Sequence, residues 1–226
     1  MTKIVVPIMP TSLEEAKALR AIDYVGADMI EWRADFMPLD LLFKAAPVIF
    51  ETFRNLPVLF TLRTTEEGGK AAVTDGVYSY ILSRILEETP VRYIDVEYFS
   101  HGSVLSDLTE VKDKLVLSYH NFKEMPSDLT ERLKEMAGIA SAVVKVAVSP
   151  ETPDEVLTFM HYARAFADSY DLTLVAIAMG EVGKATRVLS NLTGSCWTFA
   201  TAKGAASAPG QYSLDETRQL LGLLGD

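Results

Sequence analysis

A single lysine in the middle of an apolar run is the residue of this chain best suited to covalent chemistry. Lys145 is the only charged residue in Ser141-Ala-Val-Val-Lys-Val-Ala-Val148, and no residue beside it carries an opposite charge. A run so rich in valine predicts a buried strand, in which an unpaired ammonium loses its hydration and tends to become neutral. A neutral amine can form an imine with a carbonyl compound. A strand-end lysine whose ammonium reaches water fits the same segment.

A histidine ends the strand-like run that comes before Lys145. The run is Leu115-Val-Leu-Ser-Tyr-His120, and parallel neighbours lie about 4.8 Å apart, so His120 and Lys145 can be neighbours. A histidine beside an imine-forming lysine can move protons while the imine forms, and can remove one from the adjacent carbon. His101 and His161 lack metal-ligand spacing to other His, Cys or carboxylate residues, so we expect no metal site.

Charged residues also alternate near the end of the second apolar run. In Ile30-Glu-Trp-Arg-Ala-Asp35 the period of two places Glu31, Arg33 and Asp35 on one face of an extended segment. These side chains can pair with one another, and Arg33 can add positive charge near Lys145 or position Glu31. A salt bridge that only closes the rim of the fold is the structural alternative.

Arg63 ends a further apolar run and is followed by the polar loop 64–69. Such a loop suits recognition of hydroxyl groups, and an exposed charged loop without a ligand fits equally well. Two other motifs are excluded. Gly194-Ser-Cys-Trp197 lacks the first cysteine and the later histidine of a thiol protease, and neither Gly180-Glu-Val-Gly-Lys184 nor Gly68-Gly-Lys70 has the spacing of a phosphate loop.

Short apolar runs alternate with longer amphipathic segments along the chain, which predicts strands and helices in succession. About eight strand and helix units in this length predict a closed (β/α)8 TIM barrel of the α/β class, in one domain over residues 1–226. A doubly wound sheet is the alternative, weakened because no glycine fingerprint follows the first strand. Helices are expected over 12–25 and 152–170. Strands are expected over 3–9, 29–33, 58–62, 93–97, 115–119, 142–148, 172–178 and 197–201. Polar residues at the carboxyl ends of these strands would share one rim.

Composition narrows the class of protein. The chain has 226 residues, of which 49% are hydrophobic and 23% are charged, enough for a globular core. The start of the chain, Met1 to Met9, is too short for a signal peptide or membrane span, so we expect a cytoplasmic protein without membrane contact. Cys196 is the only cysteine, which excludes an internal disulfide. A net charge of -10 disfavours nucleic acid, and any attraction for an anionic substrate must be local.

These residues resemble a known family, the type I 3-dehydroquinate dehydratases. The resemblance spans nearly the whole chain. It is carried by Glu31-Trp-Arg-Ala-Asp35, Phe60-Thr-Leu-Arg63 with Glu67-Gly-Gly69, Ser118-Tyr-His-Asn-Phe122, Val144-Lys-Val146, Met179-Gly180 with Gly183 and Arg187, and Ser207-Ala-Pro-Gly-Gln211. It implies a (β/α)8 barrel, usually a homodimer, that needs no metal or cofactor and removes water from the small molecule 3-dehydroquinate to give 3-dehydroshikimate, in the shikimate pathway.

The resemblance also implies a role for each matching residue. Lys145 would be the Schiff-base lysine and His120 the general acid and base, in agreement with the reasoning above. The substrate-binding residues would be Glu31 and Arg63 for ring hydroxyls, Arg33 in the polar network, Arg187 for the carboxylate, and Ser207 and Gln211 from a loop, 205–210, small enough to close over the substrate. Glu67 would support His120, and Met179 would form an apolar wall.

Two departures and two competing hypotheses stay open. Pro7 ends the first strand where the family often has serine, and the segment from Phe199 to Ser207 is one residue longer than expected, which leaves the role of Phe199 undecided. An imine-forming aldolase or transaldolase is the first competing hypothesis, and it would require a phosphate cup after strands seven and eight. A noncatalytic barrel that binds a polyol or an acid is the second.

Overall fold

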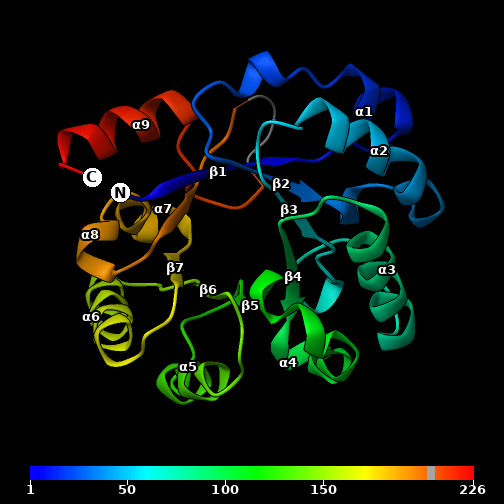
Figure 1. Cartoon of the computed structure of the whole chain (residues 1–226). Coiled ribbons are helices and arrows are strands. Elements are labelled where there is room, and N and C mark those ends of the chain that lie inside the picture. Colours follow the sequence, from blue (N-terminus) through cyan, green and yellow to red (C-terminus); the bar gives the residue numbers. More distant parts are fainter. Residues whose placement is uncertain (203–206) are drawn as a thin grey trace.

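Eight parallel strands form the centre of the structure, a computed structural model that describes residues 1–202 and 207–226. Neighbouring strands follow the order β7-β6-β5-β4-β3-β2-β1-β8, which is the barrel predicted from the sequence (Figure 1). Every predicted strand is present, and its ends differ from the prediction by at most two residues. The strands are β1 (Lys3–Ile8), β2 (Met29–Arg33), β3 (Val58–Thr61), β4 (Tyr93–Glu97), β5 (Leu115–Asn121), β6 (Val143–Val148), β7 (Leu174–Ala178) and β8 (Trp197–Phe199).

β8 closes the barrel, and it is bonded differently to its two neighbours, β1 and β7. β8 pairs with β1 in a parallel ladder, in which Lys3 lies opposite Trp197. On its other side, the Cys196 N–H donates to the Leu174 carbonyl at 2.8 Å. The Ser195 hydroxyl accepts the Ala176 N–H at 3.1 Å. A side chain and a single backbone bond therefore replace part of a ladder at the β7 to β8 seam.

Helices surround the strands, and several begin where the sequence provides a cap. The Ser12, Thr152 and Ser213 side chains each accept the N–H of a residue three positions later, and Ser213 with Glu216 forms a full capping box. The helices are α1 (Leu13–Ala18), α2 (Leu42–Thr52), α3 (Asp75–Glu88), α4 (Tyr98–His101), α5 (Leu129–Ala137), α6 (Pro153–Ser169), α7 (Gly180–Gly183), α8 (Ser190–Thr193) and α9 (Leu214–Leu223).

The helix predicted over 12–25 is wrong in its second half. α1 ends at Ala18, Leu19 is extended, and a 3-10 turn follows over Ala21–Tyr24. The turn places Tyr24 edge-on against Phe53, with ring centroids 5.2 Å apart. Burial of an aromatic ring against α2 thus outweighs the local preference for a continuous helix. The helix predicted over 152–170 is confirmed as α6, with Thr152 as its cap.

The barrel interior is filled by layers of side chains from alternate strands, as in other barrels of this kind. The layer nearest the amino ends of the strands is held together by the rings of Tyr93 and Trp197, 5.2 Å apart. It contains Met29, Tyr93, Val143 and Trp197 from the even-numbered strands, and the next contains Val5, Leu59, Val116 and Val175 from the odd-numbered strands. Two residues further along the even-numbered strands come Glu31, Asp95, Lys145 and Phe199.

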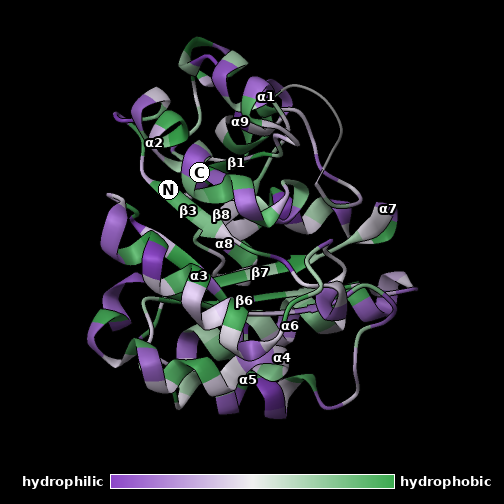
Figure 2. Ribbon diagram, turned by 90° about the vertical axis from the view of Figure 1, so that its right-hand side faces the viewer, coloured by the Kyte–Doolittle hydropathy of each residue, from purple (hydrophilic) through white to green (hydrophobic). Residues whose placement is uncertain are grey.

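A second apolar cluster lies between the outer faces of the strands and the helices. Trp32 is central to it and packs edge-on against Phe60 and Phe50. Figure 2 shows the strands in the hydrophobic colour at the centre and most hydrophilic residues on the surrounding helices. Among the residues that the structure describes, no helix combines the length and apolarity needed to cross a membrane.

Candidate active site

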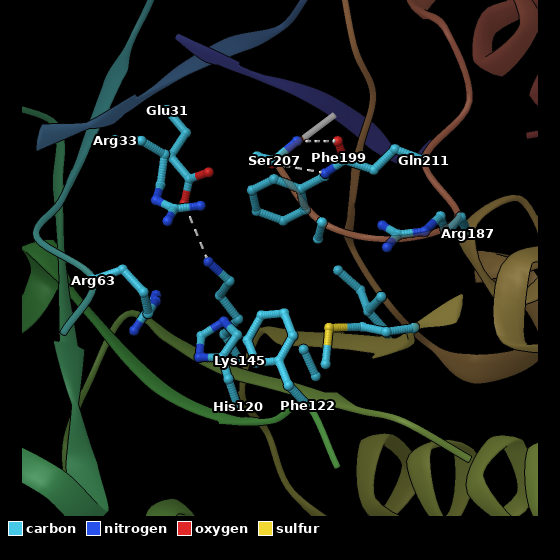
Figure 3. A pocket seen from close by; sticks show the side chains of 14 residues that line it. Glu31, Arg33, Arg63, His120, Phe122, Lys145, Arg187, Phe199, Ser207 and Gln211 are labelled. Carbon is cyan, nitrogen blue, oxygen red and sulfur yellow. Dashed lines mark hydrogen bonds and ion pairs between the residues drawn. The ribbon is translucent and has the colours of Figure 1, made fainter. Parts of the chain in front are cut away.

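A cavity opens at the carboxyl ends of the strands (Figure 3). The residues proposed from the sequence to act on or bind a substrate all line it: Glu31, Arg33, Arg63, His120, Lys145, Met179, Arg187, Ser207 and Gln211. Five further residues complete the lining, and no individual role was predicted for them: Phe122, Ala147, Ile177, Phe199 and Ala208. Glu67 does not line the cavity and lies behind His120.

Lys145 is buried on β6, and two carboxylates lie against its Nζ. Nζ is 3.3 Å from Glu31 Oε1 on β2 and 3.2 Å from Asp95 Oδ2 on β4. The expectation of a lysine without an opposite charge is therefore wrong, because its partners are 114 and 50 residues away in the sequence. The Phe199 ring on β8 lies 4.7 Å from Nζ, which gives this phenylalanine a direct contact with the lysine.

His120 is held by Glu67 through two hydrogen bonds. Its backbone N–H donates to Glu67 Oε2 at 3.0 Å, and its Nδ1 lies 2.8 Å from the same oxygen. Ser118 lies opposite Lys145 in the β5 to β6 register, so His120 lies two residues further along the same face of β5. The Phe122 ring stacks beside the imidazole at 6.4 Å and covers it on one side.

The acid-base properties of this pair follow from burial. Desolvation, with the positive charges of Arg63, Lys145 and Arg33, holds the pKa of His120 well below its ordinary value. Desolvation also raises the pKa of Glu67 to about 8, against the opposing charge of Arg63. Glu67 Oε2 accepts the backbone N–H, so we assign it as an acceptor towards Nδ1 as well. Nε2 of the neutral imidazole bonds to no other residue that the structure describes, so it can accept a proton.

Arg63 lies below the cavity among the carboxylates of Glu67, Asp95 and Glu97. One of its terminal nitrogens donates to Glu97 at 2.8 Å and to Ser118 at 3.1 Å, and the other donates to Asp95 at 2.8 Å. Glu97 also accepts the backbone N–H of Thr64 at 2.8 Å, which fixes the start of the loop that carries Glu67. Arg63 thus organises buried carboxylates while one edge of it reaches the cavity wall.

Arg33 is paired with Asp35 in a two-point contact, with both N to O distances 2.8 Å. The salt bridge considered for this segment is therefore present, and Arg33 still lines the cavity. Glu31 does not take part in it. Its Oε1 accepts the Thr61 hydroxyl at 2.9 Å and contacts Lys145, so the charges on β2 point to different partners.

Arg187 follows β7 in the 3-10 turn Lys184–Arg187 and is 2% exposed. One terminal nitrogen donates to the Pro209 carbonyl at 2.8 Å, and its buried Nε has no partner among the described residues. Burial lowers the pKa of Arg187 to about 10. No ion pair to this guanidinium forms within the described part of the chain, so it is suited to an anionic group that enters the cavity.

The loop after β8 contributes Ser207 and Gln211, which bond to each other. The Ser207 N–H donates to Gln211 Oε1 at 3.0 Å, and Gln211 Nε2 donates to the Ser207 hydroxyl at 2.9 Å. The predicted closing segment, 205–210, extends into residues 203–206, which lie outside the described residues. Pro7 is buried in β1 opposite Glu31 of β2, and its ring offers no side-chain hydrogen bond there.

Asp95 was not predicted from the sequence and the role of Phe199 was undecided, although both contact Lys145. A signal for Asp95 was present. Tyr93-Ile-Asp-Val-Glu97 has acidic residues two positions apart in an apolar run, the same feature that drew attention to Glu31 and Arg33. Phe199 gave no such signal, because a phenylalanine in a strand is most often a core residue.

Comparison with known proteins decides the family of this chain. The model of the family described as type I 3-dehydroquinase matches residues 4–226. This chain belongs to that family. A 3-dehydroquinate dehydratase of Lactococcus lactis subsp. cremoris (strain SK11) is 49% identical over 223 residues, which cover 99% of this chain and 96% of the relative. Another, of Streptococcus thermophilus (strain ATCC BAA-491 / LMD-9), is 46% identical over 213 residues, 94% of each chain.

Solved structures agree with the assignment to the type I 3-dehydroquinase family. The crystal structure of 3-dehydroquinate dehydratase from Geobacillus kaustophilus HTA426 matches with a TM-score of 0.90 and 26% identity, and the match covers 100% of this chain and 91% of that chain. The 3-hexulose-6-phosphate synthase from Salmonella typhimurium matches with a TM-score of 0.62 and 15% identity over 98% of this chain and 99% of that one, which shows the shared fold alone.

Proposed function

We propose that this chain is a 3-dehydroquinate dehydratase, a lyase that converts 3-dehydroquinate to 3-dehydroshikimate and water through a Schiff base on Lys145. The placement of three side chains around one cavity carries the proposal. A buried lysine amine, a neutral histidine and an arginine without a carboxylate partner in the described residues all line it. These are the groups needed for an imine, a proton transfer and the binding of a carboxylate.

The first stage forms the imine. Lys145 Nζ, as the neutral amine, attacks the ketone carbon, and the carbonyl oxygen leaves as water after it has been protonated. His120 is placed to carry protons to and from the carbinolamine, because its Nε2 is free while Glu67 holds Nδ1. The product is an iminium in which the nitrogen carries the positive charge. That charge makes the adjacent C–H more acidic.

The second stage removes water from the ring. His120 Nε2 takes the proton from the carbon next to the iminium, and the electron pair moves towards nitrogen to give an enamine. The enamine electrons return and expel the neighbouring hydroxyl, to which protonated His120 gives its proton so that water leaves. Hydrolysis of the conjugated iminium then restores Lys145 and frees 3-dehydroshikimate. Each proton that His120 takes is returned, so the enzyme is unchanged after one turnover.

The other cavity residues would bind the substrate. Arg187 would hold the carboxylate with two parallel hydrogen bonds, and Met179 is buried and would lie against the ring. Glu31, Arg33 and Arg63 line the side of the cavity opposite Arg187 in Figure 3 and would receive ring hydroxyls. Ser207 and Gln211 would contact the substrate from the loop above it, in exchange for the bonds they make to each other.

The test is turnover of 3-dehydroquinate by the purified protein, followed by the ultraviolet absorbance of the conjugated product. Borohydride added with the substrate should reduce the imine, and peptide mapping should find the added mass on Lys145. Lys145→Ala should lose both turnover and the added mass. Reduction onto another lysine would overturn the assignment of the nucleophile. Turnover of sugar phosphates in place of 3-dehydroquinate would instead favour an aldolase or transaldolase.

A homodimer in the cytoplasm belongs to the same proposal. Both expectations rest on the family resemblance and on composition, and neither is needed for the chemistry above. Sedimentation of the purified protein at several concentrations should give twice the mass of the 24.9 kDa chain. A monomer at all concentrations would contradict the dimer and leave the proposed reaction intact.

A further inference from the structure

We propose that Asp95 is a positioning residue for the reaction: its carboxylate holds the Lys145 nitrogen from below while the amine becomes an iminium, and it sets the pH range in which the amine can react. This inference rests on the proposed function, because it concerns the same lysine. It concerns a residue that the substrate does not reach, so its effects differ from those of the substrate-binding residues.

The two carboxylates that contact Lys145 are not equivalent. Glu31 lines the cavity, where a substrate can reach it. Asp95 is 1% exposed and is not part of the cavity lining. Its Oδ2 lies 3.2 Å from Nζ, slightly closer than the oxygen of Glu31 at 3.3 Å. A bound substrate can therefore compete for Glu31, whereas the contact between Asp95 and Lys145 stays out of its reach.

Asp95 is fixed by groups other than Lys145. Its Oδ1 accepts from Arg63 at 2.8 Å and from the Ser118 hydroxyl at 2.6 Å. Its backbone carbonyl accepts the Tyr78 hydroxyl at 3.1 Å, and the Tyr78 ring stacks on His101 at 4.6 Å. Oδ2 is thus left for Lys145, and the carboxylate keeps its place when the lysine changes its bonding.

The charge of Asp95 is maintained in the free enzyme. Burial by itself raises the pKa of this carboxyl, but the positive charges of Arg63 and Lys145 outweigh burial and bring it below its ordinary value. A lowered pKa keeps Asp95 an anion near neutral pH. An anion at this distance favours the cationic forms of the lysine nitrogen, which are the ammonium before reaction and the iminium during it.

The number of N–H groups on nitrogen changes in the reaction and gives Asp95 its particular use. The ammonium has three N–H groups and can serve Glu31 and Asp95 together. When the amine condenses with the ketone and water leaves, the iminium has only one. Of the two carboxylates beside the nitrogen, Asp95 is the one that does not face the substrate. A bond from the iminium N–H to Asp95 would orient the C=N plane and leave the carbon next to it exposed to His120.

The pH dependence of this unit involves every charged group around Lys145. The groups that face it are Glu31 from β2, Asp95 from β4 and His120 from β5, with Arg33 at the end of β2 and Arg63 after β3. Of these, Asp95 is the anion that substrate binding leaves unchanged. Its removal should therefore favour the neutral amine at lower pH and, in the same variant, weaken the stabilisation of the iminium.

The experiment compares Asp95→Asn with the unmodified chain. The variant keeps the size of the side chain and its bond to Ser118 but removes the charge. We expect kcat to fall about 10- to 100-fold, as for loss of one charged hydrogen bond, with KM changed less than about twofold because Asp95 does not line the cavity. The acid limb of kcat/KM should move to lower pH by about one unit. A slower enzyme whose acid limb moves in this direction is not expected from a purely structural defect.

Ser118→Ala is the matched control. It removes the hydroxyl that donates to Asp95 Oδ1 and accepts from Arg63, and it leaves the charge beside Lys145. Its acid limb should coincide with that of the unmodified chain. The acid limb of Asp95→Glu, which keeps the charge, should lie closer to that of the unmodified chain than the acid limb of Asp95→Asn does. An equal shift in Ser118→Ala, or an unchanged acid limb in Asp95→Asn, would overturn the role of the Asp95 charge.

Two further observations keep the test decisive. Borohydride trapping on Lys145 should persist in Asp95→Asn. Absence of trapping in the unmodified chain would refute the proposed function. Normal trapping in both, with an unshifted acid limb in Asp95→Asn, would refute only the role of Asp95. If Asp95→Asn fails to fold, the same change is made in Lys145→Met, where it no longer removes a partner of the lysine, so the double variant should fold and lose little stability relative to Lys145→Met. A double variant that also fails to fold would contradict the pairing.

Discussion

Lys145 occupies a position that is apolar in most barrels of this fold. The layers below it follow the usual rule and are built largely from Val, Leu and Met, together with two aromatic rings. At the level of Lys145 the same geometry holds two carboxylates and a phenylalanine around one nitrogen. Buried charges of this kind are costly unless paired, so the arrangement is best explained by its chemistry.

Removal of the lysine should expose that cost. Lys145→Met leaves Glu31 and Asp95 buried without the cation, and we expect the free energy of unfolding to fall by about 3–5 kcal/mol. Activity should be lost as well. Urea denaturation measures the first effect, and Lys44→Met, an exposed lysine of α2, is the control and should change stability by less than about 0.5 kcal/mol. A variant as stable as the unmodified chain would show that these carboxylates do not depend on Lys145.

The lowered pKa of His120 leads to a prediction about stability and pH. Since the folded state binds this proton less readily than the unfolded state, stability is retained above the ordinary histidine pKa of about 6.5 and is lost as pH falls from there towards the lower folded value. Over that range the unmodified chain should lose up to about 1.4 kcal/mol per pH unit relative to His120→Asn.

Urea denaturation at several pH values below neutrality checks this expectation for His120. His161→Asn provides the control, because His161 is exposed on α6. If the difference in unfolding free energy between the unmodified chain and His120→Asn is the same at every pH, the pKa of His120 is not lowered in the folded state.

At the scale of elements, the loop after β3 determines where Glu67 lies. It runs from Thr64 through the 3-10 turn Thr65–Glu67 and returns at Gly69, whose backbone packs against the Arg63 carbonyl. The Gly69 N–H also donates to the Thr64 carbonyl at 2.7 Å. A Cβ at Gly69 would lie 2.1 Å from the Arg63 oxygen, so a side chain there must displace the loop.

Gly69→Ala should therefore lower both stability and activity. We expect a loss of about 1–3 kcal/mol of unfolding free energy from overpacking, and a fall in kcat because Glu67 no longer holds His120. Gly76→Ala in α3 is the matched control: no atom lies within 4 Å of the added Cβ, and alanine should stabilise the helix by about 0.5–1 kcal/mol. Thermal unfolding and turnover are measured for both variants. If Gly69→Ala is as stable and as active as Gly76→Ala, the proposed crowding at Gly69 is contradicted.

At the scale of the whole molecule, the barrel is tied together where its ends meet. Figure 1 shows the two termini side by side next to α9. The Asp226 carboxylate accepts the Thr2 N–H at 2.7 Å and also the Thr2 hydroxyl. These bonds attach the segment after α9 to the start of β1, on the strand that β8 must pair with to close the barrel.

Asp226→Ala should loosen this attachment. Loss of these hydrogen bonds is worth about 1 kcal/mol, which corresponds to a fall of about 2–4 °C in Tm for a chain of this size. Calorimetry measures the change, with Asp171→Ala, an exposed residue before β7, as the control. An unchanged Tm in Asp226→Ala would show that the contact between the two ends contributes nothing to the stability of the barrel.

The local features of this protein follow from patterns of neighbouring residues. Strand positions followed from runs such as that around Lys145, the start of α6 from Thr152 and Pro153, and His120 and Lys145 were singled out because polar residues in apolar strands are expensive. Each of these inferences depends on residues within a few positions of one another. The ordered motifs that resemble the type I family are likewise read directly along the chain.

The groups that surround the lysine nitrogen, in contrast, depend on how the barrel folds. Its carboxylate partners lie 114 and 50 residues away, on β2 and β4, and they meet it because closure of the barrel turns alternate strands towards one centre. The local pattern therefore predicted Lys145 without an opposite charge and did not identify Asp95. Local pattern shows that a charge is buried, but strand register and barrel closure determine what neutralises it.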